Sequence, residues 1–302
     1  MARPPLAPPV TSVLDLIGNT PVVKLRSIGK DSGADLFAKL EFLSPGGSVK
    51  DRIGIGMIRS AERRGLIKPG WTLVEPTAGN TGVALALAGV QLGYKVILVV
   101  PEHFSVEKRQ LMKALGGDVV LTSESGGMKG AIEKAEEIAR TTENAYVFQQ
   151  FRNPFNADAH YETTGPEIFE QMEGRIDSFV AGAGTGGTFT GTVRYLKERI
   201  PSMRAILVEP QGSVFQGGEA GPHDVEGIGS SFIPEVLDLE LADEIVMVPD
   251  PPAFTMVARL AREEGILAGS SAGANLVAAE AEARKLGAGK RIATLIPDSG
   301  ER

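Results

Sequence analysis

Lys50 stands in a segment whose residue types suit covalent chemistry with a carbonyl compound. In "SPGGSVKDR" (44–52), Ser48 and Asp51 have the spacing of a capping box, which predicts that a helix begins at Ser48. Lys50 would then lie in the first helical turn, where the partial positive charge of the helix end disfavours an ammonium ion. Because a neutral lysine amine is a nucleophile, this position suits Schiff-base formation. The alternative interpretation is an ordinary solvated lysine after a loop.

Three further segments place glycine, serine and threonine where a predicted strand ends and a predicted helix begins. They are "EPTAGNTG" (75–82), "AGAGTGGTF" (181–189) and "AGSSAGAN" (268–275). Each would direct free backbone amides and small hydroxyls out of the carboxyl end of a sheet, where open α/β proteins bind ligands. Simple helix capping is the alternative for any one segment, but three together indicate a ligand site.

The middle segment also matches a dinucleotide-binding fingerprint. Gly182, Gly184 and Gly187 satisfy G-x-G-x-x-G, and Glu209 ends the next predicted strand 22 residues after the last glycine. A nicotinamide-dependent dehydrogenase is therefore a rival interpretation. Against it, "GTGGT" resembles a nest for a single phosphate, and a dinucleotide site leaves Lys50 and the other two segments without a role.

Pyridoxal phosphate combines the three groups for which these segments offer partners: an aldehyde, a phosphate and a ring nitrogen. Lys50 would hold the aldehyde as an internal imine, and residues 184–188 would hold the phosphate. A hydroxyl of Ser270 or Ser271 would face the pyridine nitrogen, and Asn80 would reach the ring 3-hydroxyl. Because a serine does not keep that nitrogen protonated as a carboxylate would, the electron sink is weaker, which favours elimination or replacement at the β-carbon.

The composition argues against several classes of protein. The chain of 302 residues is 42% hydrophobic and has a net charge of −7, so it can bury a large core and lacks a general nucleic-acid surface. It has no cysteine, and its histidines lie far apart, so no metal site is expected. Polar residues interrupt the apolar region 83–100, which predicts a helix and a strand rather than a membrane span. The proline-rich start at 1–10 predicts an extended or disordered leader without a signal peptide, so a cytoplasmic location is expected.

Runs of valine, isoleucine and leucine alternate with segments of helical period, which predicts a mostly parallel α/β fold. Strands are expected near 34–42, 72–76, 95–100, 118–122, 145–149, 178–182, 205–209, 244–248 and 291–296. Helices are expected near 49–65, 80–92, 105–115, 127–141, 157–172, 187–199, 253–264 and 272–286. Nine strands are many for one sheet, so we predict two doubly wound, mostly parallel sheets with a cleft between them. The loop 151–160 is predicted to cross between the sheets, and the long connection 210–234 to be functional.

Eight segments together match the pattern of one enzyme family over nearly the whole chain. They are "IGNTPVVKL" (17–25), "PGGSVKDR" (45–52), "EPTAGNTG" (75–82), "NPFNADAHYETTGPEI" (153–168), "GAGTGGTF" (182–189), "EGIGSSFIP" (226–234), "EEGILAGSSAGA" (263–274) and "PDSGER" (297–302). With them the sequence resembles the cysteine synthase (O-acetylserine sulfhydrylase) and cystathionine β-synthase family of fold-type II pyridoxal phosphate enzymes. The resemblance implies a tryptophan synthase β-like fold with the cofactor between two domains. The larger, cofactor-binding domain would comprise 1–45 and 155–302, and the smaller, mobile substrate-binding domain 46–154.

The resemblance also implies roles for single residues. Lys50 would be the imine lysine and the general acid and base at the substrate α-carbon, and Asn80 would contact the cofactor 3-hydroxyl. The phosphate would be held by Gly184, Thr185, Gly186, Gly187 and Thr188. Ser271, rather than Ser270, would face the pyridine nitrogen, and Gly227 would line the other side of the cofactor. The substrate carboxylate would be held by Thr77, Gly79, Thr81 and Gln150.

The implied reaction converts O-acetylserine to an enzyme-bound aminoacrylate, releases acetate and adds sulfide to give L-cysteine. Homocysteine as the acceptor, giving cystathionine, is the alternative, and O-phosphoserine stays open as the donor. Ala78 replaces a serine usual in the family, which removes a hydrogen bond of about 1 kcal/mol and resembles a bacterial subgroup that uses homocysteine. His223 stands where cystathionine synthases often have tyrosine, which favours sulfide. From another class, a protein that binds the cofactor without turnover also stays open.

The resemblance extends to partners and to what lies outside the matched segments. A homodimer is expected, and some members of the family bind serine acetyltransferase through its carboxyl-terminal tail. Relatives continue past "SGER" into a tyrosine-containing tail, so a shortened chain is an open interpretation. A haem-binding leader and a regulatory carboxyl-terminal domain are not seen in the sequence, which argues against the animal type of cystathionine synthase.

Overall fold

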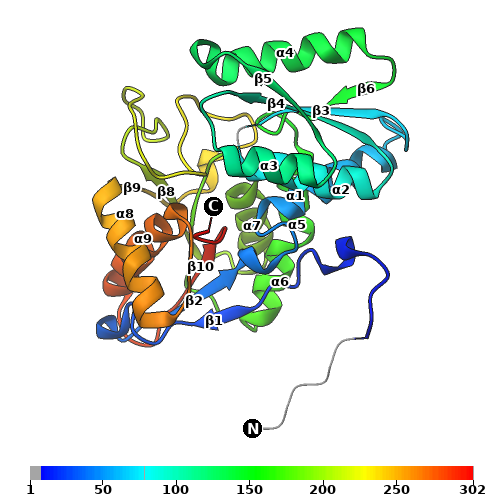
Figure 1. The fold of residues 1–302 in the computed structure, drawn as a ribbon. Coiled ribbons are helices and arrows are strands. Elements are labelled where there is room, and N and C mark those ends of the chain that lie inside the picture. The colour runs from blue at the N-terminus through cyan, green and yellow to red at the C-terminus, as the bar shows by residue number, and fades with distance from the viewer. Residues whose placement is uncertain (1–7, 78, 302) are drawn as a thin grey trace.

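The structure, a computed structural model, describes residues 8–77 and 79–301 (Figure 1). Most of the predicted leader and the predicted effect of Ala78 therefore lie outside the described residues. The described residues form two sheets, one above the other in the view of Figure 1, each with helices around it. The fold class predicted from the sequence, two mostly parallel α/β sheets, is confirmed.

The larger sheet has the strand order β1-β2-β10-β7-β8-β9. Its strands are β1 (Val22–Lys24), β2 (Asp35–Leu40), β7 (Ser178–Gly182), β8 (Arg204–Pro210), β9 (Glu244–Val248) and β10 (Arg291–Ile296). All neighbouring strands are parallel except β1, which runs antiparallel to β2. Helices cover both faces, since one apolar core lies towards α8 (Asp250–Arg259) and α9 (Ser270–Leu286) and another towards α6 (Thr164–Gln171) and α7 (Gly187–Arg199).

The smaller sheet is entirely parallel and has the order β5-β4-β3-β6. Its strands are β3 (Thr72–Pro76), β4 (Lys95–Pro101), β5 (Asp118–Thr122) and β6 (Ala145–Val147). One face packs against α1 (Lys50–Arg63), α2 (Asn80–Gln91) and α3 (Val106–Ala114), and the other against α4 (Gly127–Thr141), which lies at the top of Figure 1. Every residue of β3 is buried, as expected for a central parallel strand covered on both faces.

The structure differs from the sequence prediction at three elements. Strand β1 was not predicted, because its three residues are too short to show an alternating pattern. The helix predicted at 157–172 is two helices, α5 (Phe155–Glu162) and α6, with a break at Thr163. Thr163 leaves helical geometry (φ −129°, ψ −65°), and its hydroxyl donates to the carbonyl oxygen of Ala159 at 2.6 Å. Helix α8 ends at Arg259, and residues 260–264 form a π-helical turn.

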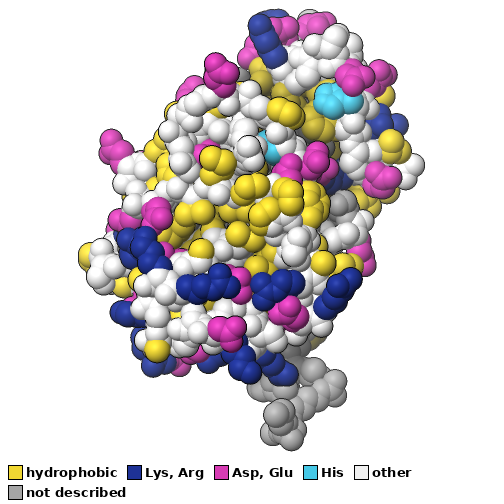
Figure 2. All heavy atoms as spheres, turned by 90° about the vertical axis from the view of Figure 1, so that its left-hand side faces the viewer, with side chains coloured by type: hydrophobic (Ala, Val, Ile, Leu, Met, Phe, Trp, Pro, Cys, Tyr) yellow, Lys and Arg dark blue, Asp and Glu magenta, His cyan; other side chains and the backbone are white. Residues whose placement is uncertain are grey.

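The surface shows charged side chains of both signs. On the side where α8 and α9 lie in Figure 1, apolar side chains gather across the middle, and basic and acidic side chains lie around them (Figure 2). None of the helices within residues 8–77 and 79–301 has the length and apolar character to cross a membrane.

Candidate functional site

Helices α2, α7 and α9 begin around one cavity of about 440 Å³ that opens between the two sheets, within the usual size of a ligand pocket. A narrower cavity continues from it beneath Gly184 and Thr185. The predicted site residues that line the two cavities are Lys50, Thr77, Gly79, Asn80, Thr81, Gln150, Gly184, Thr185, Gly186, Thr188, Gly227 and Ser271. Gly187 is not part of this lining but begins α7 next to it. The structure thus brings the three glycine-rich segments together, and the roles of their residues stay predictions.

Lys50 is the first residue of α1, but the capping box predicted for Ser48 and Asp51 is wrong. Val49 is the residue at the helix cap and offers no side-chain hydrogen bond. The Ser48 hydroxyl accepts the backbone amide of Lys50 at 3.3 Å, and the Asp51 carboxylate accepts the amide of Gly46. The preceding segment instead pairs with the residues that follow β10: Ser48 forms an isolated β-bridge with Asp298, and the amide of Val49 donates to the carbonyl oxygen of Pro297 at 2.7 Å.

The surroundings of Lys50 favour its neutral amine. Burial lowers the pKa of Lys50, and the negative charge of Asp298 opposes this only in part. The sequence predicted a neutral amine from the helix end, whereas the structure adds burial as a cause. Lys50 is therefore placed to act as a nucleophile at the wall shared by the two cavities.

The segment 184–188 forms a cradle whose glycine positions leave no room for a side chain. Gly186 has a left-handed backbone (φ 91°), and a Cβ there would lie 2.5 Å from Cβ of Leu237. A Cβ on Gly184 would lie 2.5 Å from the carbonyl oxygen of Gly227. The amides in the first turn of α7 have no partner within the helix, so the cradle fits an anionic phosphate.

Two buried side chains hold the hydroxyls of this cradle. Asn156 Nδ2 donates to Thr185 Oγ1 at 2.9 Å, and His160 Nε2 lies 3.0 Å from Thr188 Oγ1. Burial, with the positive charge of Arg52, lowers the pKa of His160 well below its ordinary value, so its ring is neutral. Neither Asn156 nor His160 was predicted as a site residue from the sequence. The signal available was their place in the matched segment 153–168.

Asn80 carries a polar atom that a ligand would satisfy. Its Nδ2 donates to Asp298 Oδ2 at 2.8 Å, while its Oδ1 is buried and receives no hydrogen bond from the described residues. A buried amide oxygen without a donor is costly, so this atom fits a ligand hydroxyl. The Ser270 hydroxyl accepts the amide of Glu226 at 2.9 Å, whereas Ser271 lines the cavity. Together with Lys50 and the cradle 184–188, these features fit the aldehyde, the phosphate and the ring groups of pyridoxal phosphate.

The wall of the cavity formed by α2, α3 and the loop after β6 carries further polar groups. Thr81 Oγ1 donates to Gln150 Oε1 at 2.7 Å, which joins the start of α2 to the loop after β6. Across the opening, Lys108 of α3 forms an ion pair of 2.7 Å with Glu226 of the 210–234 connection. The connection therefore lines the site through His223, Glu226 and Gly227.

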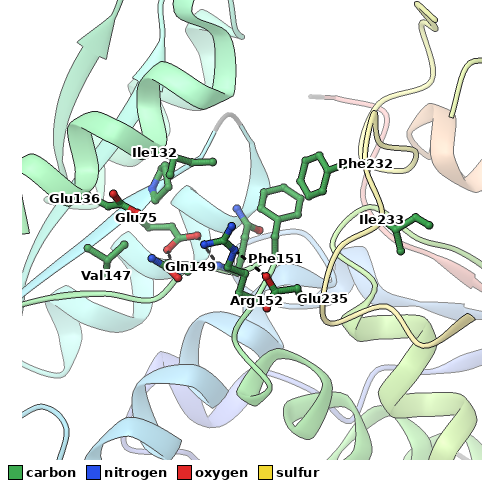
Figure 3. A pocket seen from close by; sticks show the side chains of 12 residues that line it. Glu75, Ile132, Glu136, Val147, Gln149, Phe151, Arg152, Phe232, Ile233 and Glu235 are labelled. Atoms are coloured by element: carbon green, nitrogen blue, oxygen red, sulfur yellow. Dashed lines mark hydrogen bonds and ion pairs between the residues drawn. The ribbon is translucent and has the colours of Figure 1, made fainter. Parts of the chain in front are cut away.

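A second cavity, of about 250 Å³, lies behind Gln150 and Phe151 (Figure 3). Helix α4 contributes Ile132 and Glu136, and β3 contributes Glu75. Arg152 and Glu235 close another side with an ion pair of 3.1 Å. The second cavity and the cavity of about 440 Å³ between the sheets share Gln150 and Phe151, so the loop that carries these two residues separates them.

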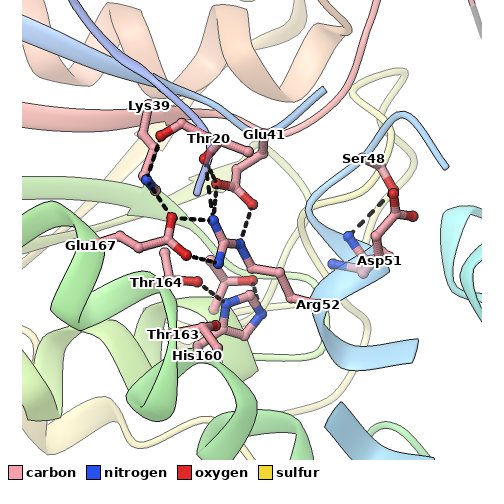
Figure 4. Close-up of polar contacts among 12 residues, drawn as sticks. Thr20, Lys39, Glu41, Ser48, Asp51, Arg52, His160, Thr163, Thr164 and Glu167 are labelled. Carbon is pink, nitrogen blue, oxygen red and sulfur yellow. Dashed lines mark hydrogen bonds and ion pairs between the residues drawn. The ribbon is translucent and has the colours of Figure 1, made fainter. Parts of the chain in front are cut away.

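A buried cluster of charges holds the start of α1 against the larger sheet (Figure 4). Arg52, two residues after Lys50, donates to Glu41 (Nε to Oε2, 2.6 Å) and to Glu167 of α6 (Nη1 to Oε1, 2.7 Å). Lys39 Nζ of β2 lies 2.8 Å from Glu167 Oε2. The arginine side chain is 1% exposed, so this cluster fixes the helical turn that carries Lys50. Sequence analysis did not find it.

Known proteins are similar to this chain over almost its whole length. A protein-family model described as "Pyridoxal-phosphate dependent enzyme" matches residues 13–298. The chain is 48% identical over 293 residues to the O-acetylserine dependent cystathionine beta-synthase of Bacillus subtilis (strain 168), covering 97% of this chain and 95% of that protein. It is 50% identical over 297 residues to the cysteine synthase of Staphylococcus aureus (strain Mu50), with the same two coverages. The crystal structure of the O-acetylserine dependent cystathionine beta-synthase from Helicobacter pylori superposes with a TM-score of 0.91 at 47% identity, covering 98% of this chain and 97% of that one.

Proposed function

The chain belongs to the family of pyridoxal-phosphate dependent enzymes, and we propose that it catalyses a β-replacement that makes L-cysteine and acetate from O-acetyl-L-serine and sulfide. The cofactor of this family is pyridoxal phosphate. When bound, it supplies the electron sink that lets the acetate leave the β-carbon. Relatives named for this β-replacement chemistry, at 48–50% identity over almost the whole chain, support the proposal.

We assign the cofactor to the cavity between the sheets. Lys50 would bind its aldehyde and move the proton at the substrate α-carbon, since burial favours the neutral amine there. The cradle 184–188 would hold the phosphate, Asn80 the ring hydroxyl and Ser271 the ring nitrogen. The observation that carries the assignment is a lysine of lowered pKa in the same cavity as an unsatisfied Asn80 Oδ1 and a glycine cradle.

The substrate carboxylate is assigned to the opposite wall. Thr77, Gly79, Thr81 and Gln150 lie at the start of α2 and in the loop after β6, where backbone amides and an amide side chain offer donors. We propose that residues 46–154 form a smaller domain that closes on the bound amino acid and excludes water. The larger domain would comprise 1–45 and 155–302.

Spectra and peptide mapping test the cofactor assignment. The purified protein should show a visible absorption band that changes when O-acetylserine is added. Borohydride reduction followed by peptide mapping should place the label on Lys50, and label on another lysine would refute the assignment. Lys50→Ala should lower kcat at least about 10³-fold, because it removes both the attachment and the proton-transfer group. Lys95→Ala, on the exposed end of β4, is the matched control and should leave kcat unchanged.

Homocysteine is the second candidate acceptor. The similarity to proteins named O-acetylserine dependent cystathionine beta-synthase favours it, and the charges of Lys108 and Glu226 at the opening would suit an amino-acid head group. Steady-state rates with sulfide and homocysteine, each with O-acetylserine and O-phosphoserine, decide both choices. A much higher kcat/KM with homocysteine would replace cysteine synthesis as the proposed reaction.

The homodimer and the complex with serine acetyltransferase stay predictions. Light scattering measures the first, and a titration with the carboxyl-terminal peptide of a serine acetyltransferase, followed through the cofactor absorption, measures the second.

A further inference from the structure

Glu75, the next-to-last residue of strand β3, lies within reach of the loop that carries Gln150. Its carboxylate accepts two consecutive backbone amides, those of Gln149 (2.9 Å) and Gln150 (3.1 Å), and the residue is 1% exposed. The side chain lines the second cavity, behind the loop, and is not part of the lining of the site between the sheets (Figure 3). Glu75 therefore contacts the loop from the side away from the ligand.

Three contacts hold Gln150 in place. Glu75 accepts its backbone amide, Asn156 Nδ2 donates to its carbonyl oxygen at 2.8 Å, and Thr81 Oγ1 donates to its Oε1 at 2.7 Å. Because Oε1 accepts the threonine hydroxyl, the two hydrogens on Nε2 are the donors left for the cavity. The same Asn156 amide donates to Thr185 Oγ1, which connects this loop to the phosphate cradle.

The loop needs an acceptor at this place. Gln149 has a left-handed backbone (φ 57°), which costs free energy for a residue with a side chain. Removing one acceptor would leave a buried amide of Gln149 or Gln150 without a partner, and the loop would lose this conformation. The orientation of the Gln150 side chain thus depends on a residue that does not touch the ligand.

We propose that Glu75 is a positioning residue for the substrate carboxylate, and that it acts by holding Gln150 so that Nε2 donates to that carboxylate. The proposal rests on the proposed function, in which Gln150 binds the amino-acid carboxylate. It goes beyond that function because it assigns part of substrate affinity to a side chain outside the site.

Glu209 provides a matched control within the same chain. It is the next-to-last residue of β8, in the same sequence, Leu-Val-Glu-Pro, and its carboxylate accepts hydrogen bonds from the amides of Phe215 (2.8 Å) and Gln216 (3.1 Å). It is 2% exposed. A Glu209→Gln change therefore makes the same chemical and structural disturbance at a loop that does not carry Gln150.

Comparing the variants at two pH values separates a loss of positioning from a general loss of folding, because the two effects should depend differently on pH. Burial raises the pKa of Glu75 to about 8, although the hydrogen bonds from the two backbone amides act to lower it. The other charged groups that line the second cavity are Glu136, Arg152 and Glu235. At pH 6.5 the carboxyl group is neutral, so Glu75→Gln replaces it closely. At pH 9 both carboxylate oxygens are full acceptors, whereas a glutamine has one.

The test measures the dissociation constant of L-alanine, which has the carboxylate but no leaving group, from the cofactor absorption of the holoenzyme. We expect Glu75→Gln to weaken binding about tenfold at pH 9 and by less than about twofold at pH 6.5, with an unchanged cofactor band. Glu209→Gln should stay within about twofold of the wild type at both pH values. In a Gln150→Ala background, Glu75→Gln should have no further effect.

Three results would overturn the proposal: equal losses in Glu75→Gln and Glu209→Gln, a loss that persists in the Gln150→Ala background, or no binding of L-alanine by the wild type. If Glu75→Gln does not fold, the wild type and Gln150→Ala suffice: deprotonation of the alanine amino group raises the affinity of both between pH 6.5 and 9, and the wild type should gain more than Gln150→Ala. Wild-type protein that binds L-alanine but turns over no donor and acceptor would refute the proposed function while leaving this measurement intact.

Discussion

Glu75 and Glu167 are glutamates shielded from solvent, and their surroundings shift their pKa values in opposite directions. Glu75 accepts two backbone amides, and burial raises its pKa to about 8. Burial acts in the same direction on Glu167, but the hydrogen bonds and charges of Arg52 and Lys39 outweigh it and lower the pKa to about 2. Buried amides alone thus hold a carboxyl group in place, whereas fixed cations also keep it charged.

The two regions hold different parts of the site. The cluster around Arg52 fixes the helical turn of Lys50 on the larger sheet, and its strength depends on compensating charges. The Glu75 contact fixes the loop of Gln150 and depends on hydrogen bonds alone. The following predictions separate these two kinds of support by their effect on stability.

The largest expected effect is that of Arg52→Met. It leaves the carboxylates of Glu41 and Glu167 in a buried site without their shared cation, which should lower the free energy of unfolding by about 3–5 kcal/mol. Urea denaturation measures the loss. Lys24→Met is the control, because its ion pair with Asp35 is largely exposed and should contribute less than about 1 kcal/mol. If Arg52→Met and Lys24→Met lowered the free energy of unfolding equally, the buried charge cluster would contribute no more to stability than an exposed ion pair, which would contradict this prediction.

The second prediction concerns pH and Glu75. Its folded pKa of about 8 lies above the ordinary value of 4.5, so between these pH values the folded protein holds a proton that the unfolded chain has lost. The stability from this group is therefore full below about pH 4.5 and lost as the pH rises to about 8, at about 1 kcal/mol per pH unit. Denaturation of Glu75→Gln from pH 5 to 8 should show a slope flatter than the wild type by this amount. An identical slope would contradict the raised pKa.

The third prediction has the opposite sign and concerns Glu167. Its folded pKa of about 2 lies below 4.5, so its contribution is full above about pH 4.5 and lost as the pH falls towards 2. After allowance for screening of this partly exposed group, the loss should be on the order of 2 kcal/mol. Acid denaturation of Glu167→Gln should therefore begin from a lower stability and depend less on pH. A variant that unfolds in acid with the full wild-type dependence would contradict this assignment.

The smallest effect is expected from Lys108→Met. Like the ion pairs of the Arg52 cluster, the pair of Lys108 with Glu226 joins a cation to a glutamate, but the side chain of Glu226 is 72% exposed. Its loss should cost about 0.5 kcal/mol, measured by urea denaturation. A cost above about 2 kcal/mol would show that exposure does not separate the two kinds of ion pair.

Many elements were predictable because their signals are local. Strands β3, β5, β7, β9 and β10 have the predicted bounds, since apolar runs between turn residues mark a buried strand. The bounds of α4 and α7 were also predicted correctly. The helix predicted at 157–172 breaks at Thr163, three residues before Pro166, whose ring and missing amide do not fit a continuous helix, and helical periodicity alone did not reveal this break.

The candidate site was predictable only in part, for the same reason. Lys50, Asn80 and the cradle 184–188 each lie in a short segment with its own signal. The partners that orient them do not: Asn80 and Asp298 are 218 residues apart in the chain, and Glu75 and Gln150 are 75 apart. No spacing rule within one segment reports such a pair.

Local sequence therefore specified where strands end, where helices begin and which small residues stand at those junctions, because glycine conformation and amide donors act over a few residues. Tertiary packing alone decided that Asn156 joins Gln150 to Thr185 and that burial lowers the pKa of Lys50. The physical reason is range. A hydrogen bond acts over about 3 Å in space, and the desolvation of a charge depends on every chain segment that excludes water from it.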